Sequence, residues 1–173
     1  MSTPAGLQLL FAEHGRSRLL VDANLLLLYF VGCVERRLIK SHGRLSDYTD
    51  DDFQLLAQLI HHFQKRGKVV TTPHILAEVS NLSEKLKGAN RENFFRVATS
   101  QIEELEEICE PARALSRLDI FPIHGLTDAA VASLAGKQKL LVLTADRPLA
   151  GDLQKRKLEV IHFSDLRQYC LAE

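Results

Sequence analysis

Short apolar runs alternate along the chain with longer stretches in which apolar residues recur at the spacing of a helix. The runs that we expect to form strands are residues 19–21, 68–71, 120–123, 140–143 and 160–163. The clearest of them, 140–143, is apolar throughout, which is typical of a strand buried on both faces of a sheet. Strands that alternate with helices favour right-handed crossovers and a parallel sheet. The pattern predicts an α/β fold: a three-layer sandwich with a mostly parallel central sheet, plus additional helices.

Residues that favour helix ends place the helices between these runs. Thr72-Pro73 marks a helix start, because it combines a capping side chain with proline in the first turn. We expect this helix to end at Gly88. The other helical segments are residues 24–34, 53–63, 128–135 and 148–157, and a terminal helix after Ser164.

Two segments are additions to the minimal fold, residues 32–52 and the helix near residues 90–110. The first ends in Asp50-Asp51-Asp52, which we interpret as a helix start, where negative charge suits the helix dipole. The second is expected to begin at Asn90 and to continue through residue 108. Its glutamates, including Glu106-Glu107, should then lie on a solvated helix face.

Length and patterning indicate one domain. The chain has 173 residues, of which we expect 18–173 to form a single domain and 1–17 an N-terminal arm. The arm lacks the basic-then-apolar order of a signal peptide. The longest apolar run, residues 25–31, is far shorter than the roughly 18 residues that a membrane span needs. We therefore expect a cytoplasmic protein without a membrane partner.

Composition excludes several other classes of protein. Apolar residues make up 46% of the chain and charged residues 25%, which excludes a disordered or fibrous chain. Lys and Arg number 22, as do Asp and Glu, so bulk positive charge does not hold a nucleic acid, although a local basic patch can. The three cysteines show no CxxC spacing, and this excludes a disulfide framework and a zinc knuckle.

Four acidic side chains are expected at the carboxyl edge of the sheet, where open α/β sheets bind their ligands. Asp22 ends the first strand, and Glu78 lies in the second turn of the helix after the second strand. Asp128 opens the helix after the strand predicted at 120–123, and Asp146 follows the strand 140–143. Taken singly, Asp128 and Asp146 are more simply explained as residues that stabilise a helix start.

Taken together, the four carboxylates indicate a metal site. Converging negative charges are hard to hold ionised, and a divalent cation removes that penalty. Oxygen ligands without Cys or clustered His favour Mg²⁺ or Mn²⁺ over Zn²⁺. The histidines do not change this interpretation, because no ligand spacing is present at His14, His42, His124 or His162.

The segments around these acids resemble the four acidic motifs of the PIN domain. They are Val21-Asp22-Ala23-Asn24, Leu76-Ala77-Glu78, Leu126-Thr127-Asp128-Ala129 and Leu143-Thr144-Ala145-Asp146, and the resemblance covers about residues 19–163. That family comprises metal-dependent ribonucleases, including RNA-processing nucleases and toxins of prokaryotic toxin–antitoxin pairs. The resemblance implies catalytic metal ligands at Asp22, Glu78, Asp128 and Asp146, and accessory polar roles for Asn24, Thr127 and Thr144.

The activity implied is a Mg²⁺- or Mn²⁺-dependent endoribonuclease with RNA as its substrate. Phosphodiester hydrolysis needs a deprotonated water and a stabilised phosphate, and one or two such ions serve both needs. We assign Asp22 and Asp146 to the first ion, with Asp128 and Glu78 completing the site. Further partners implied by the family are an antitoxin that inhibits the enzyme, if the chain is a toxin, and a second copy in a homo-oligomer.

Contact with RNA must be local in a chain of zero net charge. Arg147 directly follows Asp146 at the catalytic edge, and its fork of donors suits a phosphate. The basic run Lys155-Arg156-Lys157 lies roughly 15 Å further along the same helix, at an end where the dipole already favours cations. We therefore predict that Arg147, and not the basic run, binds RNA.

Two other functions stay open from the residues alone. A phosphatase or phosphoacceptor domain would use Asp22 as its nucleophile, but would want a second acid where Asn24 stands and a lysine near a later strand end. A non-catalytic PIN-like binding module would keep the fold without the chemistry. Retention of all four acids argues against that module.

Overall fold

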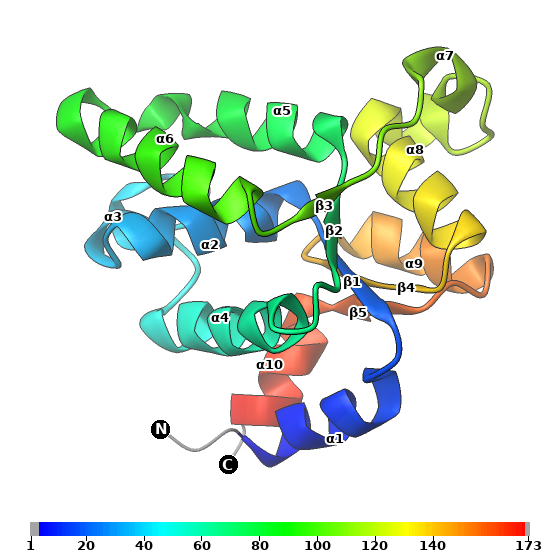
Figure 1. Cartoon of the computed structure of the whole chain (residues 1–173), viewed down its shortest axis with the longest axis horizontal. Helices are drawn as coiled ribbons and strands as arrows, with labels where there is room; N and C mark the ends of the chain where they lie inside the picture. Colours follow the sequence, from blue (N-terminus) through cyan, green and yellow to red (C-terminus); the bar gives the residue numbers. More distant parts are fainter. Residues whose placement is uncertain (1–3, 172–173) are drawn as a thin grey trace.

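A parallel five-stranded sheet forms the centre of the chain (Figure 1). The computed structural model describes residues 4–171. Every neighbouring pair of strands is parallel, and the order is β3-β2-β1-β4-β5. The strands are β1 (Arg18–Val21), β2 (Val69–Thr71), β3 (Glu106–Glu107), β4 (Leu140–Thr144) and β5 (Val160–His162). The predicted α/β class and parallel sheet are confirmed.

Helices lie on both faces of this sheet and complete the three layers. On one side are α2 (Ala23–Val34) and α4 (Asp50–Gln64), and on the other are α8 (Phe121–Lys137) and α9 (Arg147–Lys155) (Figure 1). The remaining elements are α1 (Ala5–His14), α3 (Arg37–Ser41), α5 (Pro73–Leu82), the 3-10 turn η1 (Ser83–Lys85), α6 (Gly88–Ile102), α7 (Ala112–Leu115) and α10 (Phe163–Leu171).

The central strands are buried on both faces, as their apolar composition predicts. All residues of β2 and β4 are buried, and Leu20 in β1 pairs with Val70 on one side and Val142 on the other. Helix α2 is apolar on nearly all sides, because it packs between the sheet and the helices α4, α5 and α6. This packing fixes the carboxyl ends of β1 and β4, where the site is built.

Two predicted helix starts are confirmed by their capping hydrogen bonds. Thr72 Oγ1 accepts from the Ile75 N–H at 3.2 Å, with Pro73 in the first turn of α5. The acidic run begins α4, where Thr49 and Asp52 form a reciprocal capping box. Asp52 is fully buried and also pairs with Arg167 at 3.2 Å.

The strand predicted at residues 120–123 is wrong. These residues enter α8, and the helix is interrupted at Gly125, whose φ of 82° is accessible to glycine but strained for other residues. A run of four residues is too short to separate a strand from a helix by its apolar content, and Pro122 suits a first helical turn. Asp128 therefore opens the helical segment after a kink, not the helix after a strand.

The helix predicted from Asn90 through residue 108 is also wrong at both ends. Helix α5 ends at Leu82, and Gly88, expected to close it, begins α6 with a φ of 50°. Helix α6 ends at Ile102, and Glu106–Glu107 form the exposed edge strand β3 instead of a helix face. Two exposed residues carry no strand pattern that could have been detected.

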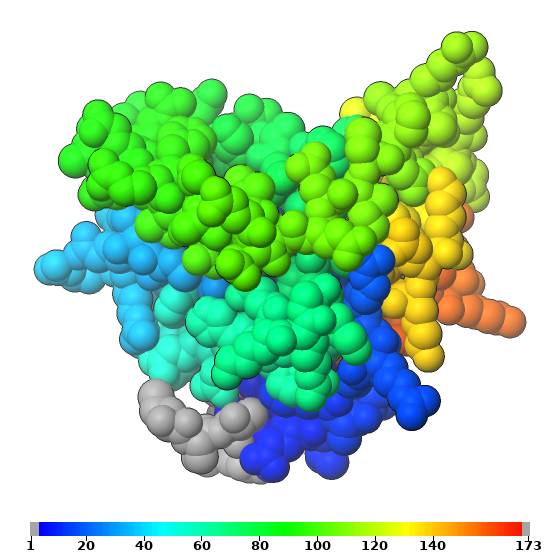
Figure 2. Space-filling model, viewed as in Figure 1, coloured from blue at the N-terminus to red at the C-terminus, as the bar shows by residue number. Residues whose placement is uncertain are grey.

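Figure 2 shows the segment around α7 projecting beyond this strand, separated by a notch from α5 and α6.

The segment expected to form an N-terminal arm contains the helix α1, which packs on α10. Its Leu7 and Leu10 are buried there. Residues 1–3 of the predicted arm lie outside the described part of the chain. Among the helices that the structure describes, none combines the length and apolar character that crossing a membrane requires.

Candidate functional site

The carboxyl ends of β1 and β4 are joined by a chain of hydrogen bonds through Thr144. The buried carboxylate of Asp22 accepts from the Ala23 N–H at 2.6 Å and from the Thr144 hydroxyl at 2.7 Å. The same hydroxyl oxygen accepts from the Asp146 N–H at 2.9 Å. Thr144 thus links the Asp22 carboxylate to the backbone of Asp146.

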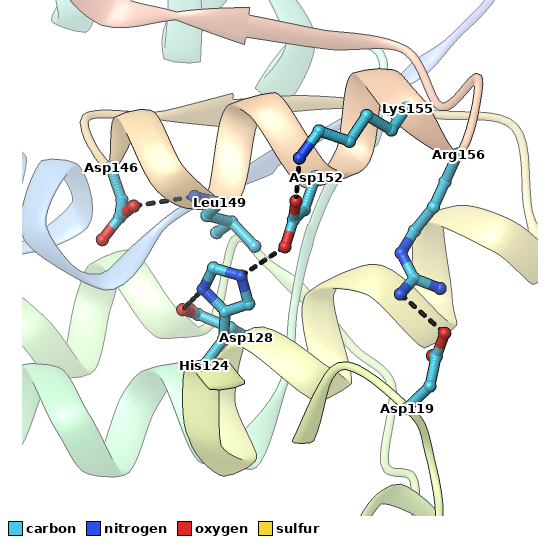
Figure 3. A network of polar contacts seen from close by, with 8 residues as sticks. All are labelled: Asp119, His124, Asp128, Asp146, Leu149, Asp152, Lys155 and Arg156. Carbon is cyan, nitrogen blue, oxygen red and sulfur yellow. Dashed lines mark hydrogen bonds and ion pairs between the residues drawn. The ribbon is translucent and has the colours of Figure 1, made fainter. Parts of the chain in front are cut away.

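Asp146 begins α9 and faces the site from the first turn of that helix. Its Oδ1 accepts from the Leu149 N–H at 2.8 Å (Figure 3). The preceding turn is held from β5, where His162 Nε2 lies 3.0 Å from the Ala145 carbonyl oxygen and therefore donates to it. Asp146 is a helix cap as well as a candidate ligand, so the two interpretations of this residue are not exclusive.

Asp128 stands on the other side of the site, in α8, and its neighbour is His124. The ring of His124 has Nδ1 3.8 Å from Asp128 Oδ2 and Nε2 2.7 Å from Asp152 Oδ2 (Figure 3). Its side chain is 7% exposed. A strand at residues 120–123 would not bring His124 and Asp128 together, so the sequence did not predict this contact. The available signal was the helical spacing of His124 and Asp128, four residues apart.

Burial and the neighbouring acids act on the pKa values of Asp128 and Asp22. Burial raises the pKa of Asp128 to about 7, and the charges of Asp22, Asp146 and Glu78 add to the rise, while His124 opposes it. Burial also raises the pKa of Asp22. Its hydrogen bonds from Thr144 and Ala23 oppose that rise, whereas the charges of Glu78 and Asp146 add to it. The sheet and its helices have brought all four predicted carboxylates into one electrostatic cluster.

Within residues 4–171, no three His, Cys, Asp or Glu side chains are grouped so as to hold a metal ion. The chemistry of the four acids nevertheless fits a hard divalent cation. All four supply carboxylate oxygens, and each Asp22 oxygen that accepts one hydrogen bond keeps a second lone pair. A cation would also offset the cost of burying these charges and their mutual repulsion, which together raise the pKa of Asp128 and Asp22.

The accessory residues differ in what surrounds them. Asn24 lies in the first turn of α2, and its Oδ1 accepts from Arg44 Nη1 at 3.1 Å. Thr127 is half-buried directly before Asp128, and the structure gives it no defined task. Tyr48 lies close enough to Asp22 for that charge to help burial raise the pKa of the phenol to about 12. Arg44 and Tyr48 come from the predicted addition 32–52, so this segment contributes to the site.

Arg147 follows Asp146 at the carboxyl edge of the sheet, and it already has partners. Its Nη2 donates to the Ser164 hydroxyl at 2.6 Å and to Asp165 Oδ1 at 2.7 Å. The pair is largely exposed, so it stabilises the fold by only about 0–1 kcal/mol and can exchange for a phosphate. The basic run is paired too, because Lys155 binds Asp152 and Arg156 binds Asp119, each at 2.9 Å (Figure 3).

Comparison with known proteins adds no further constraint on this site. No family model, no curated protein and no solved structure matches the chain.

Proposed function

We propose that the chain is a Mg²⁺- or Mn²⁺-dependent endoribonuclease. The observation that carries the proposal is the carboxyl edge of the sheet, where Thr144 joins Asp22 to the Asp146 backbone and where Asp128 lies close enough for the charges of the other acids to add to the effect of its burial. A protein that gathers four carboxylates in this way destabilises its own fold unless a cation or a proton shares the site. RNA as the substrate rests on the resemblance of the four acidic segments to the PIN domain.

The residues would divide the chemistry between them as follows. Asp22 and Asp146 would hold the cation, with Glu78 and Asp128 completing its surroundings. When bound, such an ion supplies a Lewis acid that activates water and stabilises charge on the phosphate. Thr144 would keep Asp22 oriented, and burial of that hydroxyl and that carboxylate limits competition from bulk water. His124, between Asp128 and Asp152, would position Asp128.

The phosphatase alternative, with Asp22 as a nucleophile, has less support. Asp22 is 4% exposed, and this burial leaves a phosphate group little room to approach its carboxylate in line. Asn24, where a second acid would be wanted, instead accepts from Arg44. The toxin role, an antitoxin and a homo-oligomer are refinements of the proposal that need partner-binding experiments.

Cleavage of a fluorescently labelled single-stranded RNA by purified protein tests the proposal. We expect cleavage with Mn²⁺ or Mg²⁺, none with EDTA, and none from Asp22→Asn, which keeps an amide that can cap α2. The matched control is Asp51→Asn, an exposed acid in the first turn of α4. Asp165→Asn is unsuitable, because Asp165 binds Arg147. Equal cleavage by wild type and Asp22→Asn would refute the role of the acidic cluster, and no cleavage by the wild type with either ion would leave a binding module.

A further inference from the structure

A hollow of about 310 Å³ lies beside the acidic cluster, where the C-terminal end of α5 meets the loop after α3. We call it the basic pocket, and its charged and polar walls are His42, Arg44, Asn81, Glu84, Lys85 and Lys87. Three cations therefore face one acid in a chain whose total charge is zero. Such an excess of positive charge in a concave surface favours an anionic ligand.

The positive charge of the basic pocket is not neutralised by the protein. Within residues 4–171, Arg44, Lys85 and Lys87 form no ion pair, in contrast to Arg147 and Lys155, which each bind an aspartate. The guanidinium of Arg44 donates only to a neutral amide oxygen, that of Asn24. Because a neutral partner does not cancel the charge of a cation, that charge remains available to bind an anionic ligand.

His42 forms the floor of the basic pocket and joins its two sides. It is 2% exposed, and its Nε2 lies 3.1 Å from the Leu82 carbonyl oxygen, so this nitrogen carries the proton and donates it. The bond ties the loop after α3 to the end of α5, and it leaves the positive charge of the pocket to Arg44, Lys85 and Lys87.

Two helices link the basic pocket to the acidic cluster. On α5, Asn81 follows Glu78 by three residues, which places both on one face of the helix about 4.5 Å apart along its axis. On α2, Asn24 follows Asp22 by two residues and holds Arg44. A chain that occupied the basic pocket would therefore reach the four carboxylates within a short distance.

On its other side the basic pocket adjoins a surface suited to a nucleobase. Glu84 and Lys87 also line a second hollow, which extends over Gly88 to Arg91 in α6. The guanidinium of Arg91 lies 5.6 Å from the centre of the Phe95 ring, and Phe95 is 39% exposed. An exposed aromatic ring beside arginine is a platform on which bases stack. Helices α3, α5 and α6 gather at the same end of the molecule (Figures 1 and 2).

We propose that the basic pocket and the Arg91–Phe95 surface bind single-stranded RNA and deliver it to the acidic cluster. Arg44, Lys85 and Lys87 hold phosphates of the strand, and Phe95 stacks on one of its bases. The inference deepens the proposed function, because it names the path of that substrate, but the binding it describes does not depend on cleavage.

The test measures fluorescence anisotropy of a labelled single-stranded decanucleotide RNA in EDTA, so that hydrolysis plays no part. The triple variant Arg44→Gln, Lys85→Gln, Lys87→Gln should bind about tenfold more weakly, and the slope of log affinity against log salt should fall by about 2. The matched triple variant Lys65→Gln, Lys139→Gln, Lys157→Gln removes the same charge at the opposite edge of the sheet and should bind as the wild type does. Phe95→Leu should weaken binding roughly fivefold.

The outcomes separate this inference from the proposed function. Equal losses in the two triple variants, or no loss in either, would overturn the basic pocket as an RNA site even if the wild type cleaves RNA. Selective loss in the first triple variant would support it even if no cleavage occurs. Binding of a nucleoside monophosphate as tightly as the decanucleotide would overturn the proposed strand site in favour of a site for one phosphate. Unchanged melting temperatures confirm that both triple variants are folded.

Discussion

The acidic cluster has two halves that are built in different ways. Asp22 and Asp146 extend from paired strands and share Thr144, so the backbone ladder between β1 and β4 sets their positions. Asp128 follows a kinked helix and has a histidine nitrogen 3.8 Å away as its neighbour. We call Asp22 and Asp146 the strand half, because hydrogen bonds set their positions. Asp128 is the helix half, whose neighbours act on it mainly through charge. We infer that substitutions in the strand half change geometry, whereas conditions that change charge act on the helix half.

The largest effect should come from breaking the strand half at Thr144. Thr144→Val keeps the shape of this fully buried side chain but removes both hydrogen bonds, to Asp22 and from the Asp146 N–H. We expect a loss of about 1–3 kcal/mol in the free energy of unfolding and of roughly 10–100-fold in cleavage rate. Urea unfolding and cleavage assays measure the two effects.

Thr144→Ser provides the control for that substitution, because it restores the hydroxyl. It should recover most of the activity and stability. If Thr144→Val were as active as the wild type, the hydrogen-bonded corner would be a structural feature without a part in catalysis.

A divalent cation should act on both halves at once. Because the folded state alone gathers the four carboxylates, Mn²⁺ at about 100 times its dissociation constant should stabilise the fold by about 2.7 kcal/mol, which is roughly 5–11 °C in melting temperature. Asp146→Asn should reduce the shift and Asp51→Asn should not. Differential scanning fluorimetry at increasing Mn²⁺ checks this, and an unshifted wild type would contradict the shared site.

In the absence of metal, the helix half should make the stability of the fold depend on pH. Since the pKa of Asp128 is raised in the folded state to about 7 from its ordinary 3.8, ionisation of this group destabilises the fold as the pH rises through that window. Asp128→Asn should therefore be more stable than the wild type above pH 7, and the difference should vanish below pH 4. Thermal melting in EDTA between pH 4 and pH 8 measures it.

The comparison that checks this pH effect is Asp51→Asn, whose stability relative to the wild type should not acquire the same pH dependence. A constant difference between wild type and Asp128→Asn across the range would mean that folding does not raise the pKa of Asp128.

The smallest effect is expected at Arg147, on the outer side of the strand half. Arg147→Ala should weaken RNA binding and lower cleavage a few-fold, because its exposed pair with Asp165 exchanges readily for a phosphate. Lys155→Ala should leave both unchanged, since Lys155 is bound to Asp152 far along α9. Calcium in place of magnesium separates binding from turnover, and the reverse ranking would place the RNA on another face.

The positions of the acids in the strand half could be predicted from the sequence, whereas that of Asp128 in the helix half could be predicted only in part. Asp22 and Asp146 follow unbroken apolar runs whose burial is evident, so their places at the sheet edge were predictable. The surroundings of Asp128 were not, because the kink at Gly125 depends on a backbone conformation and not on an apolar pattern. The bond between Arg44 and Asn24 joins residues 20 positions apart through tertiary packing, which no local spacing indicates.

The two-residue strand β3 bears on how the protein behaves at high concentration. An open sheet invites a second chain to add to its edges, and this is a common route to aggregation. Here one edge offers only a brief ladder that consists of two exposed glutamates, which repel their own copies. At the other edge, side chains of α1 and α10 line a hollow together with Ile161 of β5. Both edges therefore present a poor template for a further strand.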